Sequence, residues 1–92
     1  MALLSDDDIT AWLDRLAGWQ RDGDSITREL KFDDFQGSVD FVNRITPPAE
    51  EMNHHPDIAI SWNKVTLTLS THSEGGLTEN DFELATRIDS LA

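Results

Sequence analysis

The hydrophobic pattern of this chain is helical near both ends and in the middle, and strand-like in the two segments between. Near the start, four apolar residues recur every three or four positions, as on one face of a helix; they are Ile9, Trp12, Leu13 and Leu16. Ser5 precedes this stretch as a capping residue, with Asp8 three positions later, and Gly18 follows it. A first helix is therefore predicted between Ser5 and Gly18.

Two short strands are predicted next, over Trp19–Asp22 and Ser25–Phe32. The Asp22-Gly23 pair between them is typical of a tight hairpin turn. Apolar residues share one face of the second strand, which Arg28 interrupts; they are Ile26, Leu30 and Phe32.

A second helix is predicted from Asp33 or Asp34 onward. Its apolar stripe consists of Phe35, Val39, Val42, Ile45, Ala49 and Met52. Pro47-Pro48 lies within this stripe, and a proline inside a helix removes a hydrogen bond at a cost of about 3 kcal/mol. We therefore expect two helical pieces, with Thr46 capping the second, or else one sharply kinked helix.

The following segment alternates between apolar and polar residues, as a pair of strands does. Its apolar positions are Ile58, Ile60, Trp62, Val65, Leu67 and Leu69. Asn63-Lys64 suits a two-residue turn, because Asn tolerates positive φ. In that register Trp62 faces Val65 and Ile58 faces Leu69, so all six apolar residues share one face.

A last helix is predicted after Thr78 as its cap, with apolar residues Phe82, Ala85, Ile88 and Leu91. The element order is then α-β-β-α-β-β-α in a single domain over residues 1–92. Two hairpins that alternate with helices indicate an α+β fold, a four-stranded antiparallel sheet with three helices on one face.

Composition narrows the classes of function. The chain has no Cys and carries 18 acidic against 7 basic side chains, a formal net charge of −11. Disulfides and thiol chemistry are therefore excluded, and binding to nucleic-acid phosphates is disfavoured. The sequence has neither a membrane span nor a signal-peptide-like start, so we expect a cytoplasmic protein. Because a chain of 92 residues buries a limited core, a homo-oligomer is expected as well.

Three histidines in the second half are candidates for acid–base chemistry. Counted outward from the predicted turn, His72 falls opposite His55, and facing Cβ atoms in a ladder are roughly 5 Å apart. Glu50 lies one helical turn before His54, within hydrogen-bonding reach, and Glu51 stands in the same relation to His55. Imidazole has an unperturbed pKa of about 6.5, which suits proton transfer near neutral pH.

Other roles for these residues stay open at this point. Imidazoles with a carboxylate can bind zinc, although the adjacent His54 and His55 point in different directions, which disfavours a shared ion. Asp81 lies three residues after Thr78, where it can complete a capping box. Of the aromatic residues, Trp12 and Trp62 are expected in the core rather than at a ligand.

The stretch Glu-Glu-Met-Asn-His-His-Pro-Asp at residues 50–57 resembles the signature of pterin-4a-carbinolamine dehydratases. In that family an acidic or similar residue is followed, after three others, by His-His-Pro, an aromatic residue, a later His and an Asp. The matching positions here are Glu50, His54, His55, Pro56, Trp62, His72 and Asp81. The resemblance is strongest from about Val42 onward.

The resemblance implies a hydro-lyase. Such enzymes convert 4a-hydroxytetrahydrobiopterin, or a related 4a-hydroxytetrahydropterin, to quinonoid dihydropterin and water. They thereby recycle the pterin cofactor of aromatic amino-acid hydroxylases, and the reaction requires no metal or organic cofactor. The substrate implied is a small-molecule pterin.

The resemblance also implies roles for the matching residues. His54 and His72 would be the acid–base pair, serving hydroxyls on opposite faces of the pterin, and His55 would bind and orient the substrate. Two carboxylates would orient or charge-stabilise the imidazoles, and an aromatic residue would help wall the pocket; these are Glu50, Asp81 and Trp62.

Some relatives in this family act instead as interaction proteins, as transcriptional coactivators or enzyme-assembly factors. Those specialised for assembly tend to lose the histidines, and this chain keeps all three, which favours the enzyme. The family's second helix usually runs unbroken and builds a tetramer in some members. With Pro47-Pro48 in that helix, we expect a dimer, formed through the sheet or the helices, rather than a tetramer.

Overall fold

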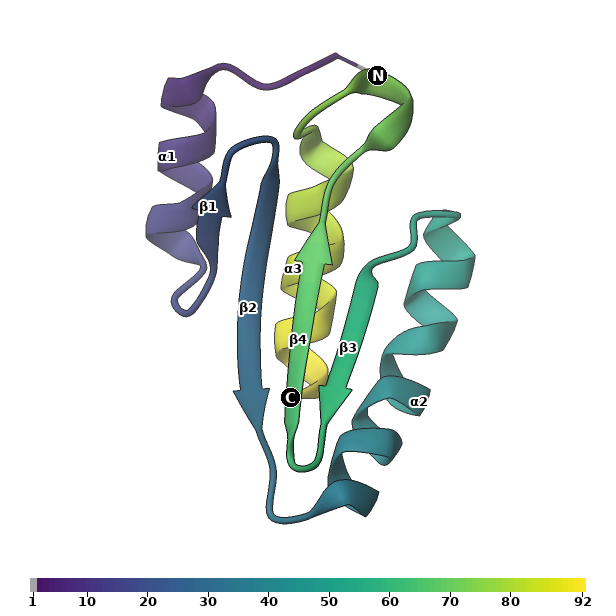
Figure 1. Ribbon diagram of the computed structural model, residues 1–92. Helices are drawn as coiled ribbons and strands as arrows, with labels where there is room; N and C mark the ends of the chain where they lie inside the picture. Colours follow the sequence, from purple (N-terminus) through teal and green to yellow (C-terminus); the bar gives the residue numbers. More distant parts are fainter. Residues whose placement is uncertain (1) are drawn as a thin grey trace.

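The structure, a computed structural model, describes residues 2–92. As predicted, it has three helices and a four-stranded antiparallel sheet (Figure 1). The elements are α1 (Asp6–Arg15), β1 (Gln20–Asp22), β2 (Ser25–Lys31), α2 (Phe35–Met52), β3 (Asp57–Ser61), β4 (Lys64–Leu69), the 3-10 turn η1 (His72–Glu74) and α3 (Glu79–Leu91). The strand order in the sheet is β1-β2-β4-β3, so β3 forms one edge. Within residues 2–92, no helix is long and apolar enough to cross a membrane.

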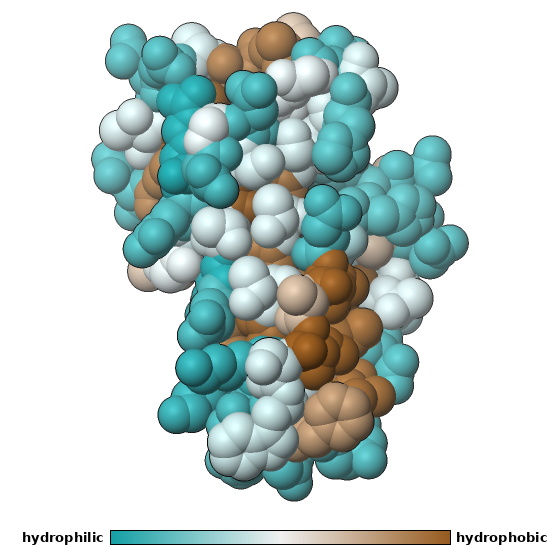
Figure 2. Space-filling model, in the orientation of Figure 1, coloured by the Kyte–Doolittle hydropathy of each residue, from teal (hydrophilic) through white to brown (hydrophobic). Residues whose placement is uncertain are grey.

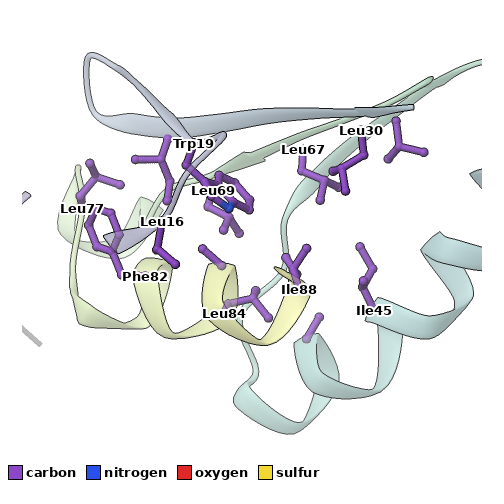
Figure 3. Close-up of a cluster of buried hydrophobic side chains, with 14 of the residues drawn as sticks. Leu16, Trp19, Leu30, Ile45, Leu67, Leu69, Leu77, Phe82, Leu84 and Ile88 are labelled. Carbon is purple, nitrogen blue, oxygen red and sulfur yellow. The ribbon is translucent and has the colours of Figure 1, made fainter. Parts of the chain in front are cut away.

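The core lies between the sheet and the helices, with α2 and α3 on the same side (Figure 3). Strand β4 and helix α3 supply fully buried side chains, among them Val65, Leu67, Leu69, Phe82 and Ile88. Helices begin at the expected capping residues, because their polar side chains accept from backbone groups of the first turn. Ser5 accepts from the N–H of Asp8 (3.1 Å), and Asp34 accepts from that of Gly37 (2.7 Å).

Helix α2 is continuous through Pro47 and Pro48. Of the two alternatives predicted for this pair, the break into two pieces is therefore wrong, and a kink within one helix stays a prediction. The two prolines have no N–H, and the carbonyls of Asn43 and Arg44 therefore lack their ordinary helical donors. Packing outweighs that loss, because buried residues lie on both sides of the pair: Phe41, Ile45 and Ala49. The helical backbone is held across the prolines by these contacts with the core.

Two further details of α2 differ from the prediction. Thr46 does not cap a second helix; its hydroxyl donates to the carbonyl of Val42 one turn back (2.8 Å). Phe35 was expected in the buried stripe but is exposed, whereas Ser38 and Phe41 are buried. The buried face of α2 is thus rotated from the predicted stripe.

The β3–β4 hairpin turns one residue earlier than predicted. Ser61 pairs with Lys64, so the loop consists of Trp62 and Asn63. Trp62 takes the left-handed φ of 51°, and the side-chain amide of Asn63 donates to the carbonyl of Phe32 (3.1 Å). Trp62 is 67% exposed, so its expected place in the core is wrong. Trp12, in contrast, is partly buried and packs against the core.

The earlier turn shifts the pairing of the two strands by two residues. Ile60 faces Val65 and Ile58 faces Leu67. Because side chains alternate with a period of two, this shift leaves the apolar residues on the predicted face. The face was therefore predicted correctly although the register was not.

Candidate functional site

A left-handed residue at the end of α2 sets the position of His54. Asn53 has φ 49° and ψ 43°, and its N–H donates to the carbonyls of Ala49 and Glu50. The N–H of His54 also returns to the carbonyl of Ala49 (3.0 Å). Asn tolerates this conformation, which turns the chain sharply away from the helix axis. The ring of His54 is thereby directed toward α3.

Asp81 supplies a fully buried carboxylate in the first turn of α3. Its Oδ2 accepts hydrogen bonds from the backbone N–H of Thr78 and from the hydroxyl of Thr71, both 2.9 Å long. Its Oδ1 lies 2.6 Å from Nε2 of His54, whose side chain is only 10% exposed. The sequence offers two separate roles for Asp81, completing a helix cap and orienting an imidazole. Its carboxylate makes both contacts at once.

The position of the proton on His54 follows once Asp81 is taken as ionised. An ionised carboxylate only accepts hydrogen bonds, and Oδ2 of Asp81 already accepts from Thr71 and Thr78. Nε2 of His54 therefore points its proton at Asp81, and Nδ1 is the nitrogen left to exchange a proton with a ligand. An imidazole anchored at one nitrogen and available at the other suits general acid–base catalysis.

His55 forms a separate pair with Glu50 on the surface. Its Nε2 lies 2.9 Å from Oε1 of Glu50, and the two side chains are 55% and 69% exposed. Exposed pairs contribute about 0–1 kcal/mol, so this contact orients His55 more than it stabilises the fold. The predicted contact of Glu50 with His54 is wrong, because His54 turns toward α3. Glu51 is expected beside His55, but its Oε1 lies 3.7 Å from Nη1 of Arg87 instead.

His72 begins the η1 turn and is exposed. The β3–β4 ladder ends before this residue, so its predicted place opposite His55 is wrong. His72 is connected to the site through the residue before it. The hydroxyl of Thr71 donates to Asp81, and Asp81 contacts His54. The backbone of His72 is therefore tied to His54 through two side-chain hydrogen bonds.

Trp62 lies apart from the histidines within this chain. It follows β3, whereas His54 and His55 precede that strand. The five residues of β3 span about 16 Å at roughly 3.3 Å per residue. Its role as a wall of the pterin pocket stays a prediction.

Two hollows lie in the structure away from the histidines. A hollow of about 350 Å³ lies between Trp12 of α1 and Glu83 of α3, and another of about 380 Å³ lies over Thr27 of β2 and Thr66 of β4. Neither of these two is lined by a candidate site residue. In the described part of the chain, no three His, Cys, Asp or Glu side chains are grouped so as to hold a metal ion.

Thr71 is a residue of this site for which the sequence alone predicts no role. It lies outside the His-His-Pro signature, but directly before His72 and within residues 63–72, which also resemble the family. The target of its hydroxyl, Asp81, is ten residues away and is reached only when η1 and α3 fold together.

The chain matches a known protein family over nearly its whole length. The family described as Pterin 4 alpha carbinolamine dehydratase matches residues 2–91. A protein of Mycobacteroides abscessus is 55% identical over 89 residues, which cover 97% of this chain and 95% of that protein. A protein of Thermosynechococcus vestitus is 51% identical over 89 residues, with coverages of 97% and 94%. Both carry the provisional name pterin-4-alpha-carbinolamine dehydratase.

Two solved structures share the fold. A transcriptional coactivator/pterin dehydratase from Brucella melitensis has a TM-score of 0.95 and 35% identity, covering 99% of both chains. A pterin dehydratase-like protein described as a RuBisCO assembly factor has a TM-score of 0.66 and 24% identity, covering 80% of this chain and 86% of its own. From the match of sequence and fold over nearly all its residues, the chain belongs to the pterin 4 alpha carbinolamine dehydratase family.

Proposed function

We propose that this protein is a hydro-lyase that dehydrates a 4a-hydroxytetrahydropterin, with 4a-hydroxytetrahydrobiopterin as the reference substrate. It would act in the cytoplasm to recycle the pterin cofactor of aromatic amino-acid hydroxylases. The observation that carries the proposal is the pair of His54 and Asp81, an imidazole anchored at Nε2 by a fully buried carboxylate. Membership of the family supplies the class of substrate.

The reaction needs one proton delivered and one removed. The C4a–O bond breaks, and the hydroxyl takes a proton and leaves as water. N5 loses its proton to a neutral imidazole or to water, and the electron pair of that N–H bond forms the C4a=N5 double bond. The substrate is neither oxidised nor reduced, so proton transfer by side chains is sufficient.

The histidines divide this work in the proposal. Protonated His54 delivers a proton from Nδ1 to the leaving hydroxyl while Nε2 stays bound to Asp81. His72 serves a hydroxyl presented from the opposite face of the pterin. His55, oriented by Glu50, binds the substrate.

A non-catalytic role as an interaction or assembly protein is the alternative. Two structures of the same fold are described as a transcriptional coactivator/pterin dehydratase and as a RuBisCO assembly factor. Such a role does not require a histidine anchored to a buried carboxylate. The pair of His54 and Asp81 therefore favours the enzyme.

The purified protein is expected to accelerate dehydration of 4a-hydroxytetrahydropterin that is generated in the assay by an aromatic amino-acid hydroxylase. The rate should exceed the spontaneous rate and should be unchanged by a metal chelator, because only proton transfers are required. Formation of quinonoid dihydropterin is followed by its absorbance. Folded protein that leaves the spontaneous rate unchanged would refute the enzyme and leave the alternative.

The proposal includes a homo-oligomer, with a dimer favoured over a tetramer. The break in α2 that had suggested a dimer is absent, so the preference now depends on β3. This edge strand carries the exposed residues Ile58 and Ile60, and Figure 2 shows an apolar area over it. Unpaired edge strands with apolar side chains readily pair with another chain. Antiparallel pairing centred on Ala59 would also bring the partner's Trp62 opposite Pro56, next to the histidines.

Light scattering is expected to give twice the mass of the chain for the wild-type protein, and the mass of one chain for Ile60→Lys. A lysine at this position brings a charge into the proposed strand–strand contact. The matched control is Thr86→Lys, which adds the same charge at an exposed position of α3 and should leave the dimer intact. A wild-type monomer, or a tetramer that Ile60→Lys leaves unchanged, would contradict this assembly.

A further inference from the structure

Two buried threonine hydroxyls lie on the side of the Asp81 carboxylate that faces away from His54. Oγ1 of Thr71 is 2.9 Å from Oδ2 of Asp81 and 2.8 Å from Oγ1 of Thr78. Thr78 is fully buried, Thr71 is nearly so, and neither belongs to the His-His-Pro family signature. The two hydroxyls and the carboxylate therefore form a buried polar group directly behind the candidate acid–base histidine.

The direction of the hydrogen bonds in this group follows from counting protons. Each hydroxyl has one proton to donate. Thr71 donates its proton to the carboxylate of Asp81, so in its contact with Thr78 it must be the acceptor. The order of donation is then Thr78 to Thr71, Thr71 to Asp81, and His54 to the other carboxylate oxygen.

The hydroxyl of Thr71 is not needed to hold its own loop. The backbone carbonyl of Thr71 already accepts from the N–H groups of Glu74, Gly75 and Gly76, and its N–H donates to the carbonyl of Gly76. The Thr71 hydroxyl is therefore not required by its own turn, and it donates to a buried carboxylate. We infer its role from that contact with the carboxylate.

We propose that Thr71 is a positioning residue for the dehydration, because it holds the Asp81 carboxylate in the orientation that keeps the proton of His54 on Nε2 and leaves Nδ1 to the substrate. This inference rests on the proposed function for its catalytic consequence, but its effect on the His54 ring does not depend on activity. Thr78 supports Thr71 by donating to it, so that the hydroxyl of Thr71 has a single direction in which to donate. Since Thr71 also directly precedes His72, one residue places both members of the proposed acid–base pair.

The test compares Thr71→Val, which keeps the shape of the side chain and removes its hydroxyl, with Thr71→Ser, which keeps the hydroxyl. The first readout is the pair of ring ¹⁵N chemical shifts of neutral His54 by NMR, without substrate. Wild-type protein and Thr71→Ser should show the proton on Nε2, and Thr71→Val should show a mixture with the Nδ1-protonated form. Asp81→Asn, whose amide N–H₂ can donate to Nε2, supplies the reference signal for the second tautomer.

The second readout is kinetic. Thr71→Val should lower kcat by about 10-fold with KM little changed, since misplacement of a catalytic group affects mainly the chemical step, and Thr71→Ser should restore kcat. The matched control is Thr86→Val on α3, whose hydroxyl donates only to the carbonyl of Phe82 one turn back (2.8 Å). It should change neither readout.

Folded Thr71→Val with wild-type ring signals would overturn the inference, whatever its activity. If that variant does not fold, the same ring measurement on Thr71→Ala decides the question by the same criterion. A wild-type protein without dehydratase activity, but with a tautomer that depends on Thr71, would refute the proposed function and leave the positioning role in place.

Discussion

His54→Gln is expected to lower the rate of pterin dehydration by roughly 10²–10⁴-fold, the usual contribution of a general acid or base. The glutamine amide can still donate toward Oδ1 of Asp81, so the buried carboxylate keeps a partner. It has no nitrogen that exchanges a proton near neutral pH. The loss should therefore appear in kcat and leave KM nearly unchanged, as measured by initial rates at several substrate concentrations.

His55→Gln is the matched control for this substitution, because it makes the same chemical change at the exposed neighbour. It should raise KM more than it lowers kcat, in line with a role in binding. His72→Gln should lose rate on the scale of His54→Gln, and the two losses need not add if either histidine partly replaces the other. Wild-type kcat in folded His54→Gln would mean that the chemistry takes place elsewhere.

Asp81→Asn is expected to slow the reaction by up to about 10⁴-fold, on the scale that an inverted histidine tautomer costs a serine protease. With its carbonyl oxygen turned to the donors Thr71 and Thr78, the amide presents its N–H₂ to His54. Nε2 must then accept a hydrogen bond from the amide, so the proton of the neutral ring moves to Nδ1. Nδ1 is the nitrogen that exchanges a proton with the substrate, and in this tautomer it is already occupied. Because every buried group still has a partner, the free energy of unfolding should change much less than the rate does.

Rates and urea unfolding curves measured on the same samples separate these two effects. Asp40→Asn is the control, since this exposed aspartate of α2 only accepts from the side chain of Gln36 (2.8 Å). Its rate and midpoint of unfolding should match those of the wild type. A large loss of stability in Asp81→Asn, with the remaining folded protein fully active, would show that Asp81 acts only as a helix cap.

The fold could be predicted because its determinants are local in the sequence. Alternation at Val65, Leu67 and Leu69 marks a strand that buries one face, and these three residues are fully buried. Ser5 and Asp34 start their helices through groups three residues away. Patterns and caps of this range act within a single element.

The site could be predicted only in part, because its contacts join distant segments. The resemblance implies that Asp81 orients an imidazole but does not say which histidine it contacts, and the observed contact with His54 spans 27 residues. The sequence predicts the turn at Asn63-Lys64, because asparagine tolerates positive φ, whereas Trp62 takes that conformation. Pro47-Pro48 predicts a break or a kink in α2 on local grounds, and the helix is nevertheless unbroken, with Ile45 and Ala49 packed in the core.

The double role of Asp81 bears on how members of this fold change over evolutionary time. A lineage that abandons the chemistry can replace the exposed His55 and His72 at little structural cost, but α3 still needs an acceptor for the N–H of Thr78. The carboxylate would then outlast the histidines that it served. In a relative without them, an aspartate at this position would record descent from an enzyme rather than present activity.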